Sequence, residues 1–226
     1  MEWWAGETPK ILVGRYGSGK TEITLNLARA IRRKFPVALI DLDIVNPFFR
    51  SAERQAWLTE QGIRLIAPEY ALTAVDIPAL PAEVMAAFAR PQYAVFDVGG
   101  DDAGAVALGR FRAQFERSGY ELWHVVNPFR PRSGTAEEVL DMIERVSRCA
   151  RLTPTGLINN ANLGGGTTPS ELQFGRELLG RVSRASGLPV VATCGTAVAL
   201  NGLSEDRSTG ALFEIERLMK PEWMEA

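Results

Sequence analysis

A glycine-rich stretch near the N-terminus carries the strongest chemical signal in this chain. Residues 14–21 read G-R-Y-G-S-G-K-T and match the phosphate-binding pattern G-x-x-x-x-G-K-[ST]. An apolar run predicts a strand directly before this stretch, and a helical pattern follows it. Such a loop surrounds the phosphates of a nucleotide with backbone N–H groups, at the positive end of a helix dipole. The sequence therefore predicts a nucleotide site here.

The residues of this loop have distinct expected roles. Lys20 would bridge the terminal phosphates and Thr21 would bind Mg²⁺, while the glycines allow a close approach that a Cβ would block. The predicted nucleotide-binding residues of the loop are Gly14, Gly17, Ser18, Gly19, Lys20, Thr21 and Glu22. A glycine-rich turn that matches by chance is the alternative, and the flanking strand and helix weigh against it.

Two acidic residues end the second predicted strand. Asp41 and Asp43 close the apolar run 37–42, and the alternation of side chains along a strand places both carboxylates on one face. Carboxylates there would orient an attacking water or hold the hydration shell of Mg²⁺. Solvated acids at a strand end are the alternative, but the run stops at the edge where ligands bind in such sheets.

A third acid lies on the predicted strand 93–98. Asp97 follows four apolar or aromatic residues, as in the Walker B arrangement, where the acid accepts a hydrogen bond from a Mg²⁺-bound water. Gly100 completes the pattern D-x-x-G, and a backbone N–H at this position can meet a γ-phosphate. We therefore expect Thr21 and Asp97 at the magnesium ion, with the carboxylates of Asp41 and Asp43 close by.

An asparagine-rich segment follows the predicted strand 155–159. Asn160 and Asn162 each carry a donor and an acceptor, so either side chain can pair with an adenine edge. A guanine reader would usually place an acid in this loop, and no acid follows here. ATP is therefore favoured over GTP, and a simple turn rich in asparagine is the alternative interpretation.

The alternation of apolar runs and helical patterns continues along the whole chain of 226 residues. Continuous apolar runs are typical of parallel strands buried on both faces. We expect strands at 10–14, 37–42, 63–66, 93–98, 121–126, 155–159 and 189–193, and helices at 19–34, 51–61, 81–89, 103–117, 134–148, 169–185 and 209–219. This order predicts one α/β domain over residues 1–226, with a doubly wound, mainly parallel sheet of about seven strands.

Composition argues against several other classes of protein. The net charge of −2 gives no sign of non-specific affinity for nucleic acid or membranes. Cys149 and Cys194 fit neither a disulfide framework nor a metal spacing, which indicates a reducing cytoplasm. His124 lies within an apolar run and is expected to be a packed strand histidine. No apolar stretch reaches the length of a membrane span, and the N-terminus lacks signal-peptide features.

Taken together, these motifs resemble the MinD/ParA branch of the SIMIBI-class P-loop ATPases, from the first predicted strand to the seventh. The resemblance implies that Asp41 acts on the hydrolytic water and that Asp43 serves the magnesium region. It also implies a Walker B role for Asp97 with Gly100, and a base contact for Asn160.

In that family a signature lysine follows the first glycine of the loop and crosses to the phosphates of a second subunit. Arg15 stands at this position, so the resemblance implies ATP-dependent dimers in which Arg15 acts in trans as an arginine finger. The implied catalytic residues are Lys20, Asp41 and Arg15. The family's membrane-binding member ends in a basic amphipathic helix, whereas Pro221 and nearby acids argue against such an anchor here.

Three functions fit these residues. The first is a nucleotide switch with slow ATP hydrolysis, in which 43–50 and 99–103 order and a protein partner or second subunit reads 46–50 and 127–132; simple proline turns are the alternative for the last two segments. The second is a small-molecule kinase or ATP-dependent ligase, in which Arg50, Arg130 and Arg132 clamp an anionic substrate. The third is a nucleotide-binding module without turnover.

Overall fold

The computed structural model describes residues 2–43, 55–67, 84–85, 87–88, 93–100, 102–206 and 208–219. Their strands form one sheet in the order β3-β2-β4-β1-β5-β6-β7-β8, and every neighbouring pair is parallel. The strands are β1 (Lys10–Val13), β2 (Val37–Leu42), β3 (Arg64–Ile66), β4 (Tyr93–Val98), β5 (Glu121–Val126), β6 (Gly156–Asn159), β7 (Val190–Gly195) and β8 (Ala211–Glu214). The predicted doubly wound P-loop fold is confirmed, with eight strands instead of about seven.

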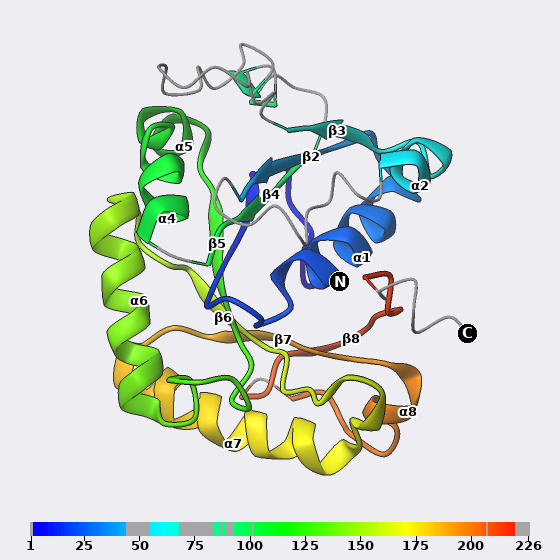
Figure 1. Ribbon diagram of the computed structural model, residues 1–226, viewed down its shortest axis with the longest axis vertical. Coiled ribbons are helices and arrows are strands. Elements are labelled where there is room, and N and C mark those ends of the chain that lie inside the picture. Colours follow the sequence, from blue (N-terminus) through cyan, green and yellow to red (C-terminus); the bar gives the residue numbers. More distant parts are fainter. Residues whose placement is uncertain are drawn as a thin grey trace.

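Helices cover both faces of this sheet (Figure 1). They are α1 (Lys20–Arg32), α2 (Gln55–Glu60), α4 (Asp102–Gly109), α5 (Arg112–Ser118), α6 (Ala136–Ala150), α7 (Pro169–Ser186) and α8 (Ala197–Leu200), with a 3-10 turn, η2, at Gly164–Gly166. In Figure 1, α1 and α2 lie on one face, opposite α4, α5 and α6. Most of the predicted helix 81–89 lies outside the described residues.

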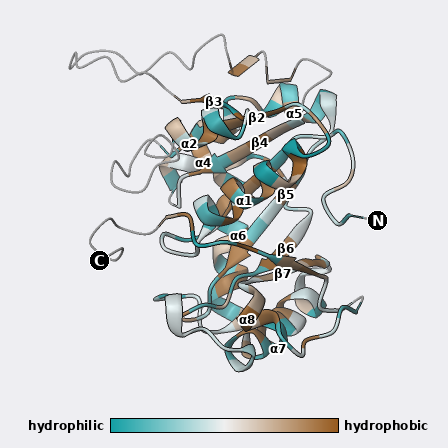
Figure 2. Cartoon of the chain, turned by 90° about the vertical axis from the view of Figure 1, so that its right-hand side faces the viewer, coloured by the Kyte–Doolittle hydropathy of each residue, from teal (hydrophilic) through white to brown (hydrophobic). Residues whose placement is uncertain are grey.

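Alternating side chains of the central strands feed two separate cores. Ile11 and Val13 of β1 pack in one apolar cluster, whereas Leu12 packs in the other with residues of α1. Figure 2 shows hydrophobic residues concentrated on the central strands and on the inner sides of the helices. The sheet is thus buried on both faces, which is why its strands read as continuous apolar runs.

The predicted helix 103–117 is two helices instead of one. The first, α4, ends at Gly109, where an added Cβ would lie 3.0 Å from the carbonyl oxygen of Ala150 on α6. The break that follows lets Phe111 and Phe115 both bury their rings in the same apolar cluster. Close packing of α4 on α6 therefore decides where the first helix ends.

The predicted helix 209–219 is wrong. Ala211–Glu214 forms the edge strand β8, which pairs in parallel with β7. Gly210, with a φ of 72°, lies so close to β7 that a Cβ would sit 2.6 Å from the backbone carbon of Val191. A short apolar run fits either type of element, and pairing with β7 decides in favour of the strand.

The expected packed histidine is confirmed. His124 lies on β5, next to Val13 of β1, and is buried. Burial and the positive charge of Lys20 lower the pKa of His124 to about 4, so the ring is neutral at neutral pH. Both cysteines are free thiols, and Cys194 is fully buried. Among the helices that the structure describes, none combines the length and apolar character needed to cross a membrane.

His124 predicts a specific pH dependence of stability. Its pKa is about 4 in the folded protein, against an ordinary value of 6.5, so the unfolded chain binds the extra proton between these values. The free energy of unfolding should therefore fall as the pH falls through this window, by about 2 kcal/mol between pH 7 and pH 5. Urea unfolding of the wild type and of His124→Gln at both pH values measures this.

The chain contains one histidine, so the difference between the two proteins isolates its contribution. The variant should lose about 2 kcal/mol less than the wild type on acidification. Equal losses in both proteins would contradict the assignment of a neutral, buried imidazole.

Candidate functional site

The phosphate-binding loop connects β1 to α1 and depends on three glycines with positive φ. Gly14, Gly17 and Gly19 have φ values of 144°, 74° and 88°, which side chains other than hydrogen rarely tolerate. The Cβ positions of Gly14 and Gly19 are also blocked, by the backbone of β5 and by the side chain of Asn160 respectively. The loop expected from the sequence is thus a tightly supported turn at the N-terminus of α1.

Lys20 is the buried cation of this loop. It begins α1, its side chain is 6% exposed, and its Nζ donates a hydrogen bond to the carbonyl oxygen of Arg15 at 3.3 Å. Ser18 Oγ is buried and has no hydrogen-bond partner among the described residues. The loop therefore presents one ammonium group and one unsatisfied hydroxyl, both suited to anionic oxygens.

The predicted acids meet at the carboxyl ends of β2 and β4. Asp41 and Asp97 are direct neighbours in the parallel register, and each is 2% exposed. Thr21 Oγ1 donates to Asp97 Oδ2 at 2.6 Å, and the backbone N–H of Asp43 donates to Asp41 Oδ1 at 2.9 Å. The structure thus brings these four residues together beside Lys20.

The surroundings of Asp97 disfavour the ionised form of its carboxyl group. Burial, together with the charges of Asp41 and Asp43, raises the pKa of Asp97 to about 7, although Lys20 and the Thr21 hydroxyl act in the opposite direction. Its Oδ1 is buried without a hydrogen-bond partner among the described residues. A nearby cation would favour the ionised carboxylate and would satisfy this oxygen.

The oxygen atoms present fit a magnesium ion that keeps most of its own water. Thr21, Asp43 and Asp97 supply hydroxyl and carboxylate oxygens, the ligand type that Mg²⁺ prefers. Within the described ranges, no three His, Cys, Asp or Glu side chains converge on a metal position. This agrees with a site that uses one or two protein ligands plus nucleotide phosphates, as Mg²⁺ sites often do.

Gly100 lies directly against the loop. A Cβ at this position would come within 2.5 Å of the backbone nitrogen of Tyr16 and 2.9 Å of the carbonyl carbon of Arg15. The segment after β4 therefore touches the same turn that would hold the terminal phosphates. This contact agrees with the predicted D-x-x-G role, in which the backbone near Gly100 responds to the γ-phosphate.

Asn160 supports the loop from the end of β6. Its buried Nδ2 donates to the carbonyl oxygen of Ser18 at 2.6 Å, and Asn162 Nδ2 donates to the carbonyl oxygen of Asn160 at 2.9 Å. Both side chains also line the cavity described next. The predicted contact between Asn160 and the base stays a prediction, because one side of its amide is already bonded to the loop.

A cavity of about 440 Å³ extends from the loop across the ends of β6 and β7 to the segment that follows β8. This is a usual size for a small-molecule site. The lining residues are Tyr16, Gly17, Gly19, Lys20, Thr21, Glu22, Asp43, Arg130, Asn160, Asn162, Gly164, Thr167, Gly195, Thr196, Ile215, Arg217 and Met219. Several predicted site residues therefore share one cavity.

Several of these lining groups were not among the residues expected to bind the nucleotide, and Arg130 was expected instead as a clamp for an anionic substrate. Arg130, in the loop after β5, donates from Nε to the carbonyl oxygen of Gly17 in the phosphate-binding loop at 3.0 Å. Gly195 and Thr196 follow β7 at the same carboxyl edge, so the rule that pointed to Asn160 would also have found them. Arg217 was missed because the sequence predicted a helix over 209–219, where the structure has the strand β8.

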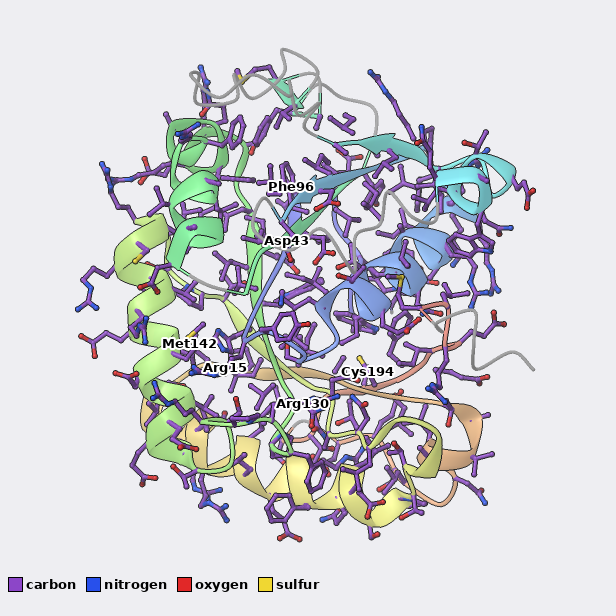
Figure 3. The ribbon with its side chains drawn as sticks, in the orientation of Figure 1. Arg15, Asp43, Phe96, Arg130, Met142 and Cys194 are labelled. Atoms are coloured by element: carbon purple, nitrogen blue, oxygen red, sulfur yellow. The ribbon has the colours of Figure 1, made fainter. Side chains whose placement is uncertain are left out.

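Arg15 points away from this cavity. Its Nη1 lies 3.9 Å from the sulfur of Met142 on α6, and Figure 3 shows the two residues side by side. Arg15 lines a second cavity of about 350 Å³ together with Arg132, Glu137, Glu138, Asp141 and Arg145. Within one chain, the side chain of the predicted catalytic residue Arg15 therefore does not lie with those of Lys20 and Asp41. The predicted partner segment 46–50 and Arg50 lie outside the described residues.

No family model and no curated protein matches the chain. Solved structures with a similar fold include the cell division protein FtsY from Thermotoga maritima, at 18% identity and a TM-score of 0.62, with 91% of this chain and 67% of that chain covered. The chloroplast FtsY from Physcomitrella patens is 16% identical, with 91% and 61% covered and a TM-score of 0.56. The signal recognition particle receptor FtsY from Elizabethkingia anophelis is 16% identical, with 90% and 62% covered and a TM-score of 0.53.

The chain spans about three fifths to two thirds of the length of these FtsY structures. At such low identity the likeness shows the fold, an α/β P-loop fold with a parallel sheet. It says nothing of the base that the cavity accepts.

The bond between Asn160 and the loop predicts a measurable contribution to stability. Asn160→Ala removes the donor that satisfies the buried carbonyl of Ser18, so the free energy of unfolding should fall by about 1–3 kcal/mol. The exposed Asn201, at the end of α8, offers a matched control, and Asn201→Ala should change stability by less than about 0.5 kcal/mol. Urea unfolding of the three proteins measures this, and equal stability of the two variants would contradict the supporting role.

Proposed function

We propose that this protein is a Mg²⁺-dependent ATPase of the MinD/ParA-like type, which acts as a nucleotide-dependent switch on a protein partner. The observation that carries the proposal is the hydrogen bond from Thr21 Oγ1 to Asp97 Oδ2. It joins the phosphate-binding loop to the acid of the neighbouring strand, and this pairing is what a nucleotide–magnesium site needs. The fold shared with FtsY structures agrees with nucleotide binding.

Different residues of the proposed site bind the phosphates, the metal ion and the attacking water. The backbone N–H groups of the loop and the Lys20 ammonium hold the phosphates, and Thr21, Asp43 and Asp97 hold the ion. Bound Mg²⁺ would neutralise charge on the phosphate oxygens. Asp41 is held by the N–H of Asp43 and would orient the attacking water. These roles agree with a slow hydrolase.

The proposed base is adenine. No acid follows β6, and the side chains at its end are the amides of Asn160 and Asn162. A guanine reader would use a carboxylate to accept from the two N–H groups of the base. A direct comparison of ATP and GTP binding tests this assignment.

The switch element would be the contact between the loop and the end of β4. Gly100 abuts the backbone of Arg15 and Tyr16, and Gly99 abuts the carboxylate of Asp43. Loss of the γ-phosphate would therefore change the packing of both segments together. Tyr16 of the loop is 62% exposed, and Phe129 of segment 127–132 is 37% exposed. A partner or second subunit would read the change at these two residues.

A small-molecule kinase or ligase is the second candidate, and the position of Arg130 favours it. Arg130 lines the nucleotide cavity and binds the loop at Gly17, so its guanidinium could hold an anionic acceptor beside the phosphates. Such an enzyme would transfer phosphate only when its acceptor is present. Phosphate release from ATP and water alone would favour the switch.

Removing the buried ammonium gives the direct test of nucleotide binding. We expect wild-type protein with Mg²⁺ to bind ATP at least about tenfold more tightly than GTP, and Lys20→Ala to lose ATP affinity by about 100-fold or more. Isothermal titration calorimetry measures both. The exposed Lys34, which pairs with Glu2 far from the cavity, gives the control variant Lys34→Ala, with unchanged affinity.

Tight ATP binding by Lys20→Ala would contradict the assignment of the loop. Tighter binding of GTP by the wild type would leave the nucleotide site intact but reject the proposed base.

Removing the Arg15 side chain should slow ATP hydrolysis and leave ATP binding largely unchanged. If Arg15 serves a second subunit in trans, Arg15→Ala should bind ATP within about threefold of the wild type but lose phosphate release by about 100-fold or more. The same variant should regain part of its activity when mixed with the Lys20→Ala protein, because the intact loop of the Arg15→Ala subunit then receives Arg15 from the other subunit. Phosphate release and light scattering after size-exclusion chromatography measure activity and ATP-driven dimers.

Unchanged turnover in Arg15→Ala would reject the in-trans role. A loss of turnover that mixing never rescues would place Arg15 in its own subunit's site.

A further inference from the structure

The segment after β8, residues 215–219, runs along α1 and is bound to it through its backbone. Asn26 Nδ2 donates to the carbonyl oxygen of Glu216 at 2.9 Å, and the N–H of Glu216 donates to Asn26 Oδ1 at 2.9 Å. The Asn26 amide thus pairs with both backbone groups of one residue, as a neighbouring strand would. Figure 1 shows this last described part of the chain, coloured red, beside α1.

A second α1 side chain binds the same segment one helical turn earlier. The carboxylate of Glu22 accepts hydrogen bonds from the backbone N–H groups of Leu218 and Met219. Arg29, on the other side of Asn26, forms an ion pair with Glu216 at 2.5 Å. The three side chains lie on one face of α1, because residues three or four apart are neighbours there.

Backbone binding on one side directs alternate side chains to the other side. Ile215, Arg217 and Met219 all line the 440 Å³ cavity, whereas Glu216 and Leu218 do not. The Glu216 carboxylate pairs with Arg29 of α1 instead, and Leu218 packs against the apolar cluster that contains residues of α1. A period of two is the signature of extended chain. The segment therefore forms a wall of the cavity, in which Arg217 lies between the apolar side chains of Ile215 and Met219.

This wall lies at the end of the cavity formed by the loops after β6 and β7. The guanidinium nitrogens of Arg217 lie 3.7 Å and 3.0 Å from the Cβ positions that Gly164 and Gly165 would have in η2. The cavity here is also lined by Gly195 and Thr196 after β7. The phosphate-binding residues of the loop stand at the other end, so a nucleotide with its phosphates there would extend its base toward Arg217.

The side chains of Asn160 and Asn162, after β6, already form hydrogen bonds with the protein backbone. Asn160 Nδ2 is bonded to Ser18, and the Asn162 amide bonds to Asn160 on one side and to the N–H of Gly164 on the other. Arg217 forms no comparable hydrogen bond with another described residue, and its guanidinium is a flat cation. A guanidinium plane stacks well on an aromatic ring.

On the premise of the proposed function, we propose that segment 215–219 is the base-binding wall of the nucleotide site. The purine packs on Ile215 and Met219 and against the guanidinium of Arg217. Glu22 and Asn26 are positioning residues that hold this wall on α1. Since Glu22 directly follows Thr21, the base end of the site is fixed to the same helical turn that serves the phosphates and the metal.

The test separates the base from the phosphates. Calorimetry compares the binding of Mg²⁺–ATP with that of inorganic triphosphate, which lacks the base and the ribose. Arg217→Ala should weaken ATP binding about tenfold and leave triphosphate affinity within about twofold of the wild type. Arg184→Ala is the matched control, because this exposed arginine of α7 lies outside the cavity, and it should change neither affinity.

Two further variants distinguish the proposed contacts from a general loss of structure. Arg217→Lys keeps the charge without the planar group and should weaken ATP binding by about threefold or more, with an unchanged thermal unfolding curve. Asn26→Ala should also weaken ATP selectively. The double variant with Arg217→Ala should lose less than the product of the two single effects, because both changes act on one wall.

The outcomes separate the two proposals. If the wild type binds neither ATP nor GTP, the proposed function fails and the base wall falls with it. If ATP binds but Arg217→Ala binds it equally well, or loses triphosphate as strongly as ATP, the proposed function stands and the base wall is overturned. Wild-type affinity in Arg217→Lys would overturn the stacking contact.

Discussion

Buried charge beneath the phosphate-binding loop is the constraint on which the rest of the site depends. Lys20 is almost fully buried, and the carboxylates of Asp41 and Asp97 lie side by side on adjacent strands with little access to water. Charges in such surroundings are costly unless they are paired. Burial, with the charge of Asp41, raises the pKa of Asp97, and burial, with the charge of Lys20, lowers the pKa of His124. A triphosphate above Lys20 and a divalent cation beside Asp97 would balance this arrangement, so the buried charges make sense as one half of a nucleotide complex.

The parallel sheet explains how residues far apart in the chain meet around these charges. The described strands are parallel and end at the same edge, so the loops after β1, β5, β6 and β7 meet there with Asp43 at the end of β2 and Gly100 after β4. Gly100 then packs on the loop backbone, Asn160 supports it from below, and Arg130 donates a hydrogen bond to it. The segment after β8 completes the enclosure from the side of α1, to which Glu22 and Asn26 bind it. Helix α1 and the strand ends thus hold both ends of the proposed site.

The parts that the sequence predicts correctly are those with a local cause. The loop glycines need positive φ, and the acids follow continuous apolar runs, so Lys20, Thr21 and Asp97 could be placed together from pattern alone. The features that could not be predicted from the sequence depend on tertiary contacts. The strand β8 forms because β7 offers a free edge, and Arg217 enters the cavity only once that strand exists. The side chain of Arg15 likewise has no local signal for its place beside α6.

One measurement tests the central claim most directly: a crystal structure of the protein with Mg²⁺ and a non-hydrolysable ATP analogue. We expect the triphosphate inside the turn of residues 14–21, in contact with Lys20, and the metal next to the oxygens of Thr21 and Asp97. A crystal grown with saturating analogue that showed no ligand in this turn, or showed it only in the cavity beside Arg15 and Arg145, would contradict the account.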